Sequence, residues 1–183
     1  AEELHSRLGV VFQSDFLMAD TLRENIRFGR NIADPEIFDA IDCAQASFIH
    51  QKDGVLDHEL NVRGRNLSGG QQQRVAIART LALNPDIVLF DEPMSALDVD
   101  TRLSLRTELK QIQALFGTTM IYITHDQEEA FAMSDRIMVM GSGKIHQIDT
   151  PQNIIDNPAD LFVENFVLKN LKMKIDSLFK YVK

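Results

Sequence analysis

Asp91 and Glu92 are two adjacent carboxylates that come directly after the apolar run of residues 87–90. A continuous apolar run of this kind is typical of a parallel strand that is covered on both faces. In open α/β sheets, ligands bind at the carboxyl ends of such strands. At that place Asp91 would hold Mg²⁺ through the ion's hydration shell, and Glu92 would accept a proton from an attacking water or orient it. Taken alone, the pair is explained equally well as two solvated carboxylates at a strand end.

The second candidate is the run of residues 67–74, which reads Leu-Ser-Gly-Gly-Gln-Gln-Gln-Arg. Ser68 and Gln71 have the spacing of a capping box, so we expect a helix to begin here. Gly69 and Gly70 let the backbone approach a ligand closely, and a helix N-terminus offers unpaired N–H groups and a positive dipole to an anion. A bare Ser-Gly-Gly is usually an ordinary capped helix start, but the full run is far more specific.

Three further candidates carry little information singly. Gln13 follows the strand-like run of residues 8–12, and a glutamine at a strand end indicates almost nothing by itself. His125 follows another strand-like run, and a lone histidine is usually structural. Asp98 ends the sequence Ser-Ala-Leu-Asp, which by itself predicts a turn that caps a helix. The order of these residues along the chain is more informative than any one of them.

In this order, the five motifs resemble those of the ATPase domain of ATP-binding-cassette (ABC) transporters. The run of residues 67–74 resembles the ABC signature motif, and residues 87–93 resemble the Walker B strand. The resemblance covers residues 8–126 and extends to about residue 168 through later Gly-Lys-Ile, Thr-Pro and Asn-Pro sequences. It implies an α/β fold, namely a partial P-loop NTPase (RecA-like) domain with a mainly parallel sheet and a helical signature subdomain.

The resemblance also implies a role for each candidate residue. ATP and Mg²⁺ are the implied cofactors, with Gln13, as the Q-loop glutamine, and Asp91 at the metal. The implied catalytic residues are Glu92 and His125, the latter as the switch histidine at the γ-phosphate. Asp98 would belong to the D-loop, which crosses the interface between two ATPase subunits. The implied nucleotide-binding residues are Gln13, Ser68, Gly69, Gly70, Gln71 and Asp98.

A phosphate-binding loop of the pattern Gly-x-x-x-x-Gly-Lys-Ser/Thr is absent from the 183 residues. The one Gly-Lys pair, Gly143-Lys144, is followed by Ile145, and Met138 stands where the first glycine would be. In the family this Walker A loop precedes the Q-loop. We therefore expect that the chain starts within a longer protein, that it alone neither binds ATP tightly nor hydrolyses it, and that it can lend its signature helix to a complete partner.

The elements that must position these residues alternate between strands and helices, as in an α/β fold. We predict strands over residues 8–12, 87–90 and 120–123, and a hairpin over residues 137–148. One helix carries residues 103–115 and ends at the following glycine. Further helices are predicted to begin near Thr21, Asp34, Ser68, Gln127, Thr150 and Pro158.

Three segments follow from this arrangement. We expect an ABC ATPase domain over residues 1–168, in which residues 14–84 form the helical signature subdomain. Residues 169–183 are locally basic, with apolar residues at roughly helical spacing, and predict an amphipathic helix that packs on its own domain. A helix that binds a membrane surface or a partner is the alternative for this last segment.

Composition and charge narrow the class of protein. The formal net charge of −8, without a long run of Lys and Arg, argues against nucleic acid as a partner. A single cysteine fits a reducing compartment, and no apolar run approaches the ~18 residues of a membrane span. We expect a peripheral protein at the cytoplasmic face of the cell membrane. Its expected partners are transmembrane permease subunits and a second ATPase subunit.

The two halves of the chain resemble different ABC proteins. Residues 21–26 and 63–66 resemble exporter ATPase domains, whereas residues 71–74, 124–130 and 150–152 resemble importer subunits for osmoprotectants, polyamines and sugars. Because the second match is longer, we expect an importer subunit, with an exporter domain as the alternative. Outside transport, the alternatives are a soluble ABC protein or a regulatory or structural fragment. Soluble ABC proteins normally show two signature motifs or a long coiled-coil insertion, and this sequence shows neither.

Overall fold

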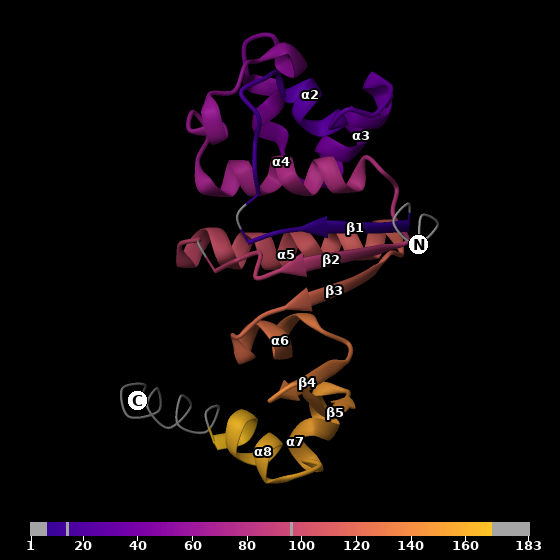
Figure 1. The fold of residues 1–183 in the computed structure, drawn as a ribbon, viewed down its shortest axis with the longest axis vertical. Helices are drawn as coiled ribbons and strands as arrows, with labels where there is room; N and C mark the ends of the chain where they lie inside the picture. Colours follow the sequence, from indigo (N-terminus) through magenta and orange to yellow (C-terminus); the bar gives the residue numbers. More distant parts are fainter. Residues whose placement is uncertain (1–6, 14, 96, 170–183) are drawn as a thin grey trace. The chain divides into compact units, whose positions relative to one another are not determined.

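A parallel sheet with the strand order β1-β2-β3 lies in the first part of the chain (Figure 1). Its strands are β1 (Leu8–Val11), β2 (Ile87–Asp91) and β3 (Thr119–Ile123). In the register, Ile87 of β2 lies opposite Leu8 on one side and Thr119 on the other. The predicted mainly parallel α/β sheet is therefore confirmed, and each strand starts or ends within a residue of its predicted position.

The computed structural model describes residues 7–13, 15–95 and 97–169. The chain divides into two units, Ala1–Ile123 and Thr124–Lys183, which we describe separately. The other elements of the first unit are, in chain order, α2 (Leu22–Arg27), α3 (Asp34–Cys43), the 3-10 segments η1 (Ser47–Gln51), η2 (Val55–Asp57) and η3 (Val62–Gly64), α4 (Gly69–Leu81) and α5 (Val99–Phe116). None of the helices among the described residues is both long and apolar enough to cross a membrane.

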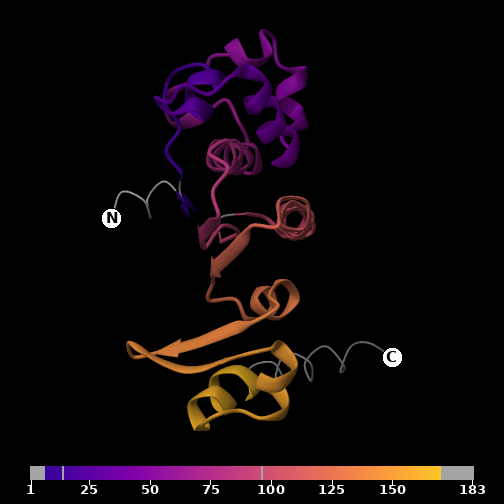
Figure 2. The same cartoon turned by 90° about the vertical axis from the view of Figure 1, so that its right-hand side faces the viewer.

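Helices α4 and α5 lie on the same side of the sheet (Figure 2). The approach of α4 to β1 is close, because a Cβ atom at Gly9 would lie 2.4 Å from Cγ2 of Thr80. On the covered side, Val88 and Phe90 of β2 are fully buried. The Phe90 ring stacks on Tyr122 of β3 with a centroid separation of 4.8 Å.

The opposite side of the sheet is open among the described residues. Ile121 and Ile123 of β3 are 46% and 48% exposed, and Ile87 and Leu89 of β2 are half-buried. The prediction that β2 is covered on both faces is therefore wrong for the described residues. The apolar run reflects a strand with two apolar sides, and the two neighbouring helices cover one of them.

The helical segment between β1 and β2 follows its sequence signals. Thr21 caps α2 by accepting a hydrogen bond from the backbone N–H of Glu24 at 3.2 Å. Proline occupies the first turn of α3, as predicted, where its missing N–H costs nothing. A buried amide holds the loop before α2, since Asn25 accepts from Met18 N and donates to Met18 O. Large apolar side chains that are fully buried in this segment include Leu22, Ile26, Ile37, Ile41 and Ile49.

The second unit is a hairpin packed on short helices. Its elements are α6 (Gln127–Met133), β4 (Ile137–Gly141), β5 (Lys144–Asp149), α7 (Pro151–Asp156), α8 (Leu161–Val163) and a π-helical turn, η4 (Glu164–Lys169). β4 and β5 are antiparallel, so the predicted hairpin is confirmed. The core of the unit consists of Val139, Ile154, Val163 and Val167.

The prediction that a helix begins near Pro158 is wrong by three residues. The helix α8 begins at Leu161, because Asp160 is its cap and accepts from the N–H of Val163 at 2.9 Å. Ala159 instead donates its N–H to Gln147 of β5 at 2.9 Å, which keeps this stretch in a loop. Of the predicted helix over residues 169–183, all but Lys169 lies outside the described residues.

Candidate functional site

Glu92 stands directly after β2 in a conformation that L-residues rarely adopt. Its φ angle is +46°, in the left-handed region. The backbone is held there from both sides: Glu92 N donates to Ile123 O at 2.9 Å, and the N–H and hydroxyl of Ser95 donate to Glu92 O at 3.2 and 2.9 Å. Strained residues of this kind persist only where the surrounding structure holds them in place, and they cluster at functional sites.

Gln13 and Glu92 lie together although 79 positions separate them in the sequence. The Nε2 atom of Gln13 donates to Ser95 Oγ at 3.0 Å and approaches Glu92 Oε2 at 3.5 Å. The contact arises because β1 and β2 are adjacent and parallel, so that their carboxyl ends meet at one edge of the sheet. Asp91 is the last residue of β2, opposite Ile123. The structure thus brings Gln13, Asp91 and Glu92 to the same edge.

The oxygen atoms at this edge suit a hard cation that takes its remaining ligands from water and from a bound phosphate compound. Among the described residues, no group of three or more His, Cys, Asp or Glu side chains forms a cation site on its own. Mg²⁺ is usually held by one or two carboxylates together with waters and phosphate oxygens. Gln13 uses its amide nitrogen for the bonds to Ser95 and Glu92. Neither bond uses its Oε1, the atom that a cation prefers.

Ser68 begins α4 as predicted, with both bonds of the capping box present. Gln71 N donates to Ser68 Oγ at 3.3 Å, and Ser68 N donates to Gln71 Oε1 at 3.0 Å. Gly69 and Gly70 form the first turn of this 13-residue helix, and Ser68 and Gly69 are exposed. The start of α4 therefore presents backbone N–H groups at an accessible helix N-terminus, which suits an anion.

Asp98 caps α5 next to this turn. Its Oδ1 accepts from Thr101 N at 3.0 Å, and its Oδ2 accepts from the Thr101 hydroxyl at 2.7 Å. The bond from the Thr101 N–H, followed by that from its hydroxyl, lowers the pKa of Asp98 from its ordinary value. The two helix starts touch, since a Cβ atom at Gly70 would lie 2.9 Å from Thr101 Cγ2. The candidates of these two segments therefore lie side by side.

Arg79 links α4 to the segment after Gln13, a contact that the sequence did not predict. Its Nε donates to Asn25 O at 2.8 Å, its Nη2 donates to Phe16 O at 3.0 Å, and its Nη1 lies 3.9 Å from Asp15 Oδ1. Burial lowers the pKa of Arg79 and raises that of Asp15, and their opposite charges partly offset both shifts. In the sequence, the one signal for this contact is that Arg79 interrupts a run of helix residues that are otherwise buried.

His125 belongs to the second unit, where it precedes α6. Its neighbours are fixed by hydrogen bonds: Thr124 Oγ1 donates to Glu129 Oε2 at 2.8 Å, and Asp126 N donates to Thr124 Oγ1 at 3.0 Å. Asp126 caps α6 by accepting from Glu128 N at 2.8 Å. The His125 side chain is exposed. Its catalytic role stays a prediction, as do the roles of the other site residues.

Comparisons with known proteins point to one family. The sequence model of the ABC transporter family matches residues 1–95. The chain is 45% identical over 165 residues to the spermidine/putrescine import ATP-binding protein PotA of Nitratidesulfovibrio vulgaris, covering 88% of this chain and 43% of that protein. It is 42% identical over 171 residues to the Fe(3+) ions import ATP-binding protein FbpC of Fusobacterium nucleatum, covering 91% of this chain and 44% of that protein.

A solved structure agrees with these sequence matches. The structure of a bacterial Atm1-family ABC exporter with ATP bound superimposes with a TM-score of 0.76 and 34% sequence identity. The superposition covers 92% of this chain and 29% of that chain. The 183 residues therefore span less than half of the length of each protein compared here.

Proposed function

Since the chain belongs to the ABC transporter family, we propose that it is part of the ATP-hydrolysing subunit of a transporter that imports a solute. The proposal concerns the longer protein that contains these residues, because the chain spans 43% and 44% of the two import proteins described above. Within it, residues 1–168 are part of the ATPase domain, and residues 14–84 form its helical signature subdomain.

The juxtaposition of Gln13 and Glu92 at the edge of the sheet carries the proposal. Glu92 accepts a proton from the attacking water, or orients it, at the strained position after β2. Gln13 and Asp91 would hold Mg²⁺, which would supply positive charge to the phosphates of ATP. His125 contacts the γ-phosphate and joins Glu92 as the second catalytic residue. Oxygen ligands in this small number fit a magnesium ion that takes its remaining ligands from nucleotide and water.

The signature segment serves a second subunit. Ser68, Gly69, Gly70 and Gln71 present a helix N-terminus to the phosphates of ATP that the partner subunit holds, and Asp98 lies beside them at the same interface. The 183 residues contain no Walker A sequence. The chain by itself is thus expected neither to bind ATP tightly nor to hydrolyse it.

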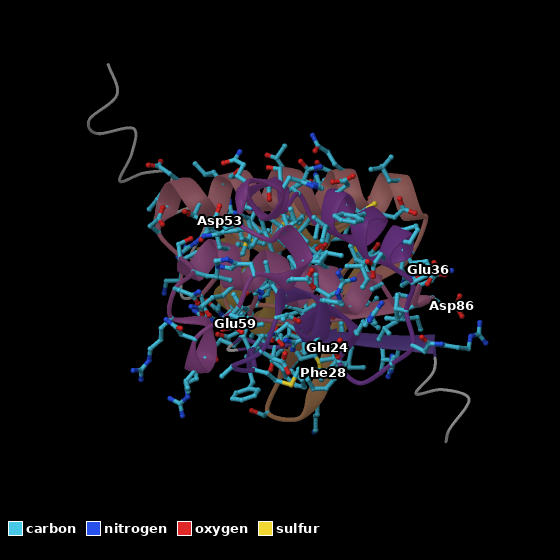
Figure 3. All side chains as sticks on the ribbon, turned by 90° about the horizontal axis from the view of Figure 1, so that it is seen from above. Glu24, Phe28, Glu36, Asp53, Glu59 and Asp86 are labelled. Atoms are coloured by element: carbon cyan, nitrogen blue, oxygen red, sulfur yellow. The ribbon has the colours of Figure 1, made fainter. Side chains whose placement is uncertain are left out.

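Exposed aromatic side chains next to Arg79 support a permease partner. Phe16 and Phe28 are 59% and 54% exposed. Both border Arg79, which bonds to Phe16 O and lies 4.8 Å from the centre of the Phe28 ring. Figure 3 shows Phe28 beside Glu24 at the margin of the first unit. Exposed apolar patches mark protein interfaces, and a cytoplasmic loop of a transmembrane permease is the partner that fits this family. The subunit would then lie at the cytoplasmic face of the membrane.

An exporter ATPase domain is the alternative, because the structural relative is a bacterial exporter. The two import proteins favour the first interpretation. Co-purification with a separate transmembrane permease supports an importer subunit, whereas membrane spans within the same polypeptide indicate an exporter.

The variant Glu92→Gln in the longer protein tests the proposal. Removing the carboxylate that accepts the proton lowers kcat for ATP by roughly 10²–10⁴-fold, while binding of MgATP is kept. The measurement is phosphate release at saturating MgATP, together with a nucleotide titration. Glu59→Gln is the matched control, since Glu59 is exposed (labelled in Figure 3) and belongs to the loop between η2 and η3. Equal turnover in the two variants would contradict the role of Glu92.

A further inference from the structure

The first turn of α4 packs on the first turn of α5 through one of its two glycines. A Cβ atom at Gly70 would lie 2.9 Å from Thr101 Cγ2 and 3.4 Å from Arg74 Nη1. A Cβ atom at Gly69 would lie 3.9 Å from Leu97 Cδ2, which is ordinary van der Waals contact. The two glycines therefore differ, because α5 occupies the space beside Gly70 and leaves room at Gly69.

The methyl group of Thr101 is fixed in place. The Thr101 hydroxyl donates to Asp98 Oδ2 at 2.7 Å, and the Thr101 N–H donates to Asp98 Oδ1 at 3.0 Å. Rotating χ1 to move the methyl group away from Gly70 would break the hydroxyl bond to the cap. A β-branched side chain in a helix also has few alternative rotamers. A larger residue at position 70 thus meets a rigid neighbour.

An ion pair joins the same two helices one turn further along α4. Arg74 Nη2 and Nε donate to Glu108 Oε1 and Oε2 at 2.7 and 3.1 Å. Ser104 Oγ donates to the same carboxylate at 2.6 Å. The side chains of Arg74 and Glu108 are only 17% and 15% exposed. Two-point arginine–carboxylate pairs are strong and fix geometry as well as charge. Together with the contact at Gly70, the pair attaches α4 to α5 at two places.

We propose that Gly70, Thr101, Arg74 and Glu108 form a joint that holds the signature start of α4 and the Asp98 start of α5 as one surface. In this joint, a glycine is required at position 70 because only it leaves room for the Thr101 methyl group. This role is additional to any close approach of a ligand to the Gly70 backbone. Arg74 and Glu108 are positioning residues. The effect of the joint on ATP hydrolysis rests on the function proposed above. The existence of the joint is independent of that function.

Thermal unfolding of the 183-residue chain tests the joint without any nucleotide. Gly70→Ala lowers Tm by roughly 2–12 °C, because an extra methyl group in a packed site is destabilising. Gly69→Ala is the matched control in the same helical turn, and its Tm stays the same or rises, since alanine favours the helix. Thr101→Ser removes Cγ2 and keeps the hydroxyl, so adding it to Gly70→Ala restores most of the lost Tm. Equal Tm values for both alanine variants, or no recovery, overturn the proposal.

Turnover by the longer protein tests the positioning role. Gly70→Ala lowers kcat at saturating MgATP by about 10²-fold through misplacement of the signature start, and Thr101→Ser recovers a large part of it. Arg74→Lys, which keeps the charge but loses the two-point geometry, lowers kcat more than it raises KM.

Two outcomes separate the claims. If Thr101→Ser, added to Gly70→Ala, restores Tm but not kcat, the joint does not position the signature start. The effect of Gly70 on kcat would then come only from the close approach of a ligand. If the unsubstituted longer protein hydrolyses no ATP, the proposed function fails, while the Tm series still decides whether the joint exists.

Discussion

At the residue scale, the site depends on contacts between residues that are distant in sequence. Gln13, Glu92 and Ser95 come together because two adjacent parallel strands end at the same edge. Arg79 extends this group into α4, since it bonds to the backbone of Phe16 and Asn25. A change at Arg79 therefore affects the chain that follows Gln13, although Arg79 does not itself reach the candidate catalytic residue through any of these bonds.

We expect Arg79→Lys to destabilise the first unit by about 1–3 kcal/mol. Lysine keeps the charge but does not reach both carbonyls with a planar fork, so one or two of these hydrogen bonds are lost. Urea unfolding measures the change. Arg7→Lys is the control, because Arg7 pairs with Asp86 at the surface, with the two side chains 62% and 56% exposed. Surface pairs of this kind contribute little. A control variant as unstable as Arg79→Lys would show that the fork geometry is irrelevant.

At the scale of secondary-structure elements, hydrogen-bonding caps set where the helices begin. Thr21, Ser68 and Thr150 all cap the helices that follow them, as their sequences predicted. Asp98 does the same for α5, and its pKa is lowered mainly by the bond from the Thr101 N–H. A carboxyl group with a lowered folded pKa stabilises the fold fully above its unfolded pKa. That contribution is lost as the pH falls through the folded pKa.

We predict that Asp98→Asn weakens the acid sensitivity of the first unit. Asparagine keeps a capping oxygen but has no carboxyl group to protonate. The loss of Tm from about pH 5 to pH 2 is therefore smaller in the variant than in the natural chain. Circular dichroism melts across this range measure the difference. Asp100→Asn removes a charge from the same turn without removing the cap, and an equal effect there would refute the explanation.

The elements were predictable because their signals are local. Apolar runs marked β1, β2 and β3, and capping residues marked most helix starts. The prediction that a helix begins near Pro158 was wrong because Asp160, two residues later, provides the cap that begins α8. The apolar run of β2 predicted a strand with two apolar sides, but such a run does not specify which helices lie over each side. The contacts of Arg79 and the joint at Gly70 depend on how α4 lies against its neighbours, which no local pattern specifies.

At the scale of the whole molecule, the chain combines the residues proposed to act on ATP with residues proposed to complete another subunit's site. Glu92 and Gln13 belong to the first group, and Ser68, Gly69 and Gly70 to the second. The 183 residues hold no Walker A sequence, which in this family supplies most of the phosphate contacts. We therefore propose that tight nucleotide binding needs a Walker A sequence, which these 183 residues do not supply.

Isothermal titration of MgATP into the 183-residue chain tests this division most directly. The signature start and the edge at Glu92 offer too few phosphate contacts by themselves, so we expect no saturable binding at micromolar MgATP. A circular dichroism spectrum of the same sample confirms that the chain is folded. A micromolar Kd with one nucleotide per chain would contradict the account, because these residues would then hold ATP without the Walker A loop.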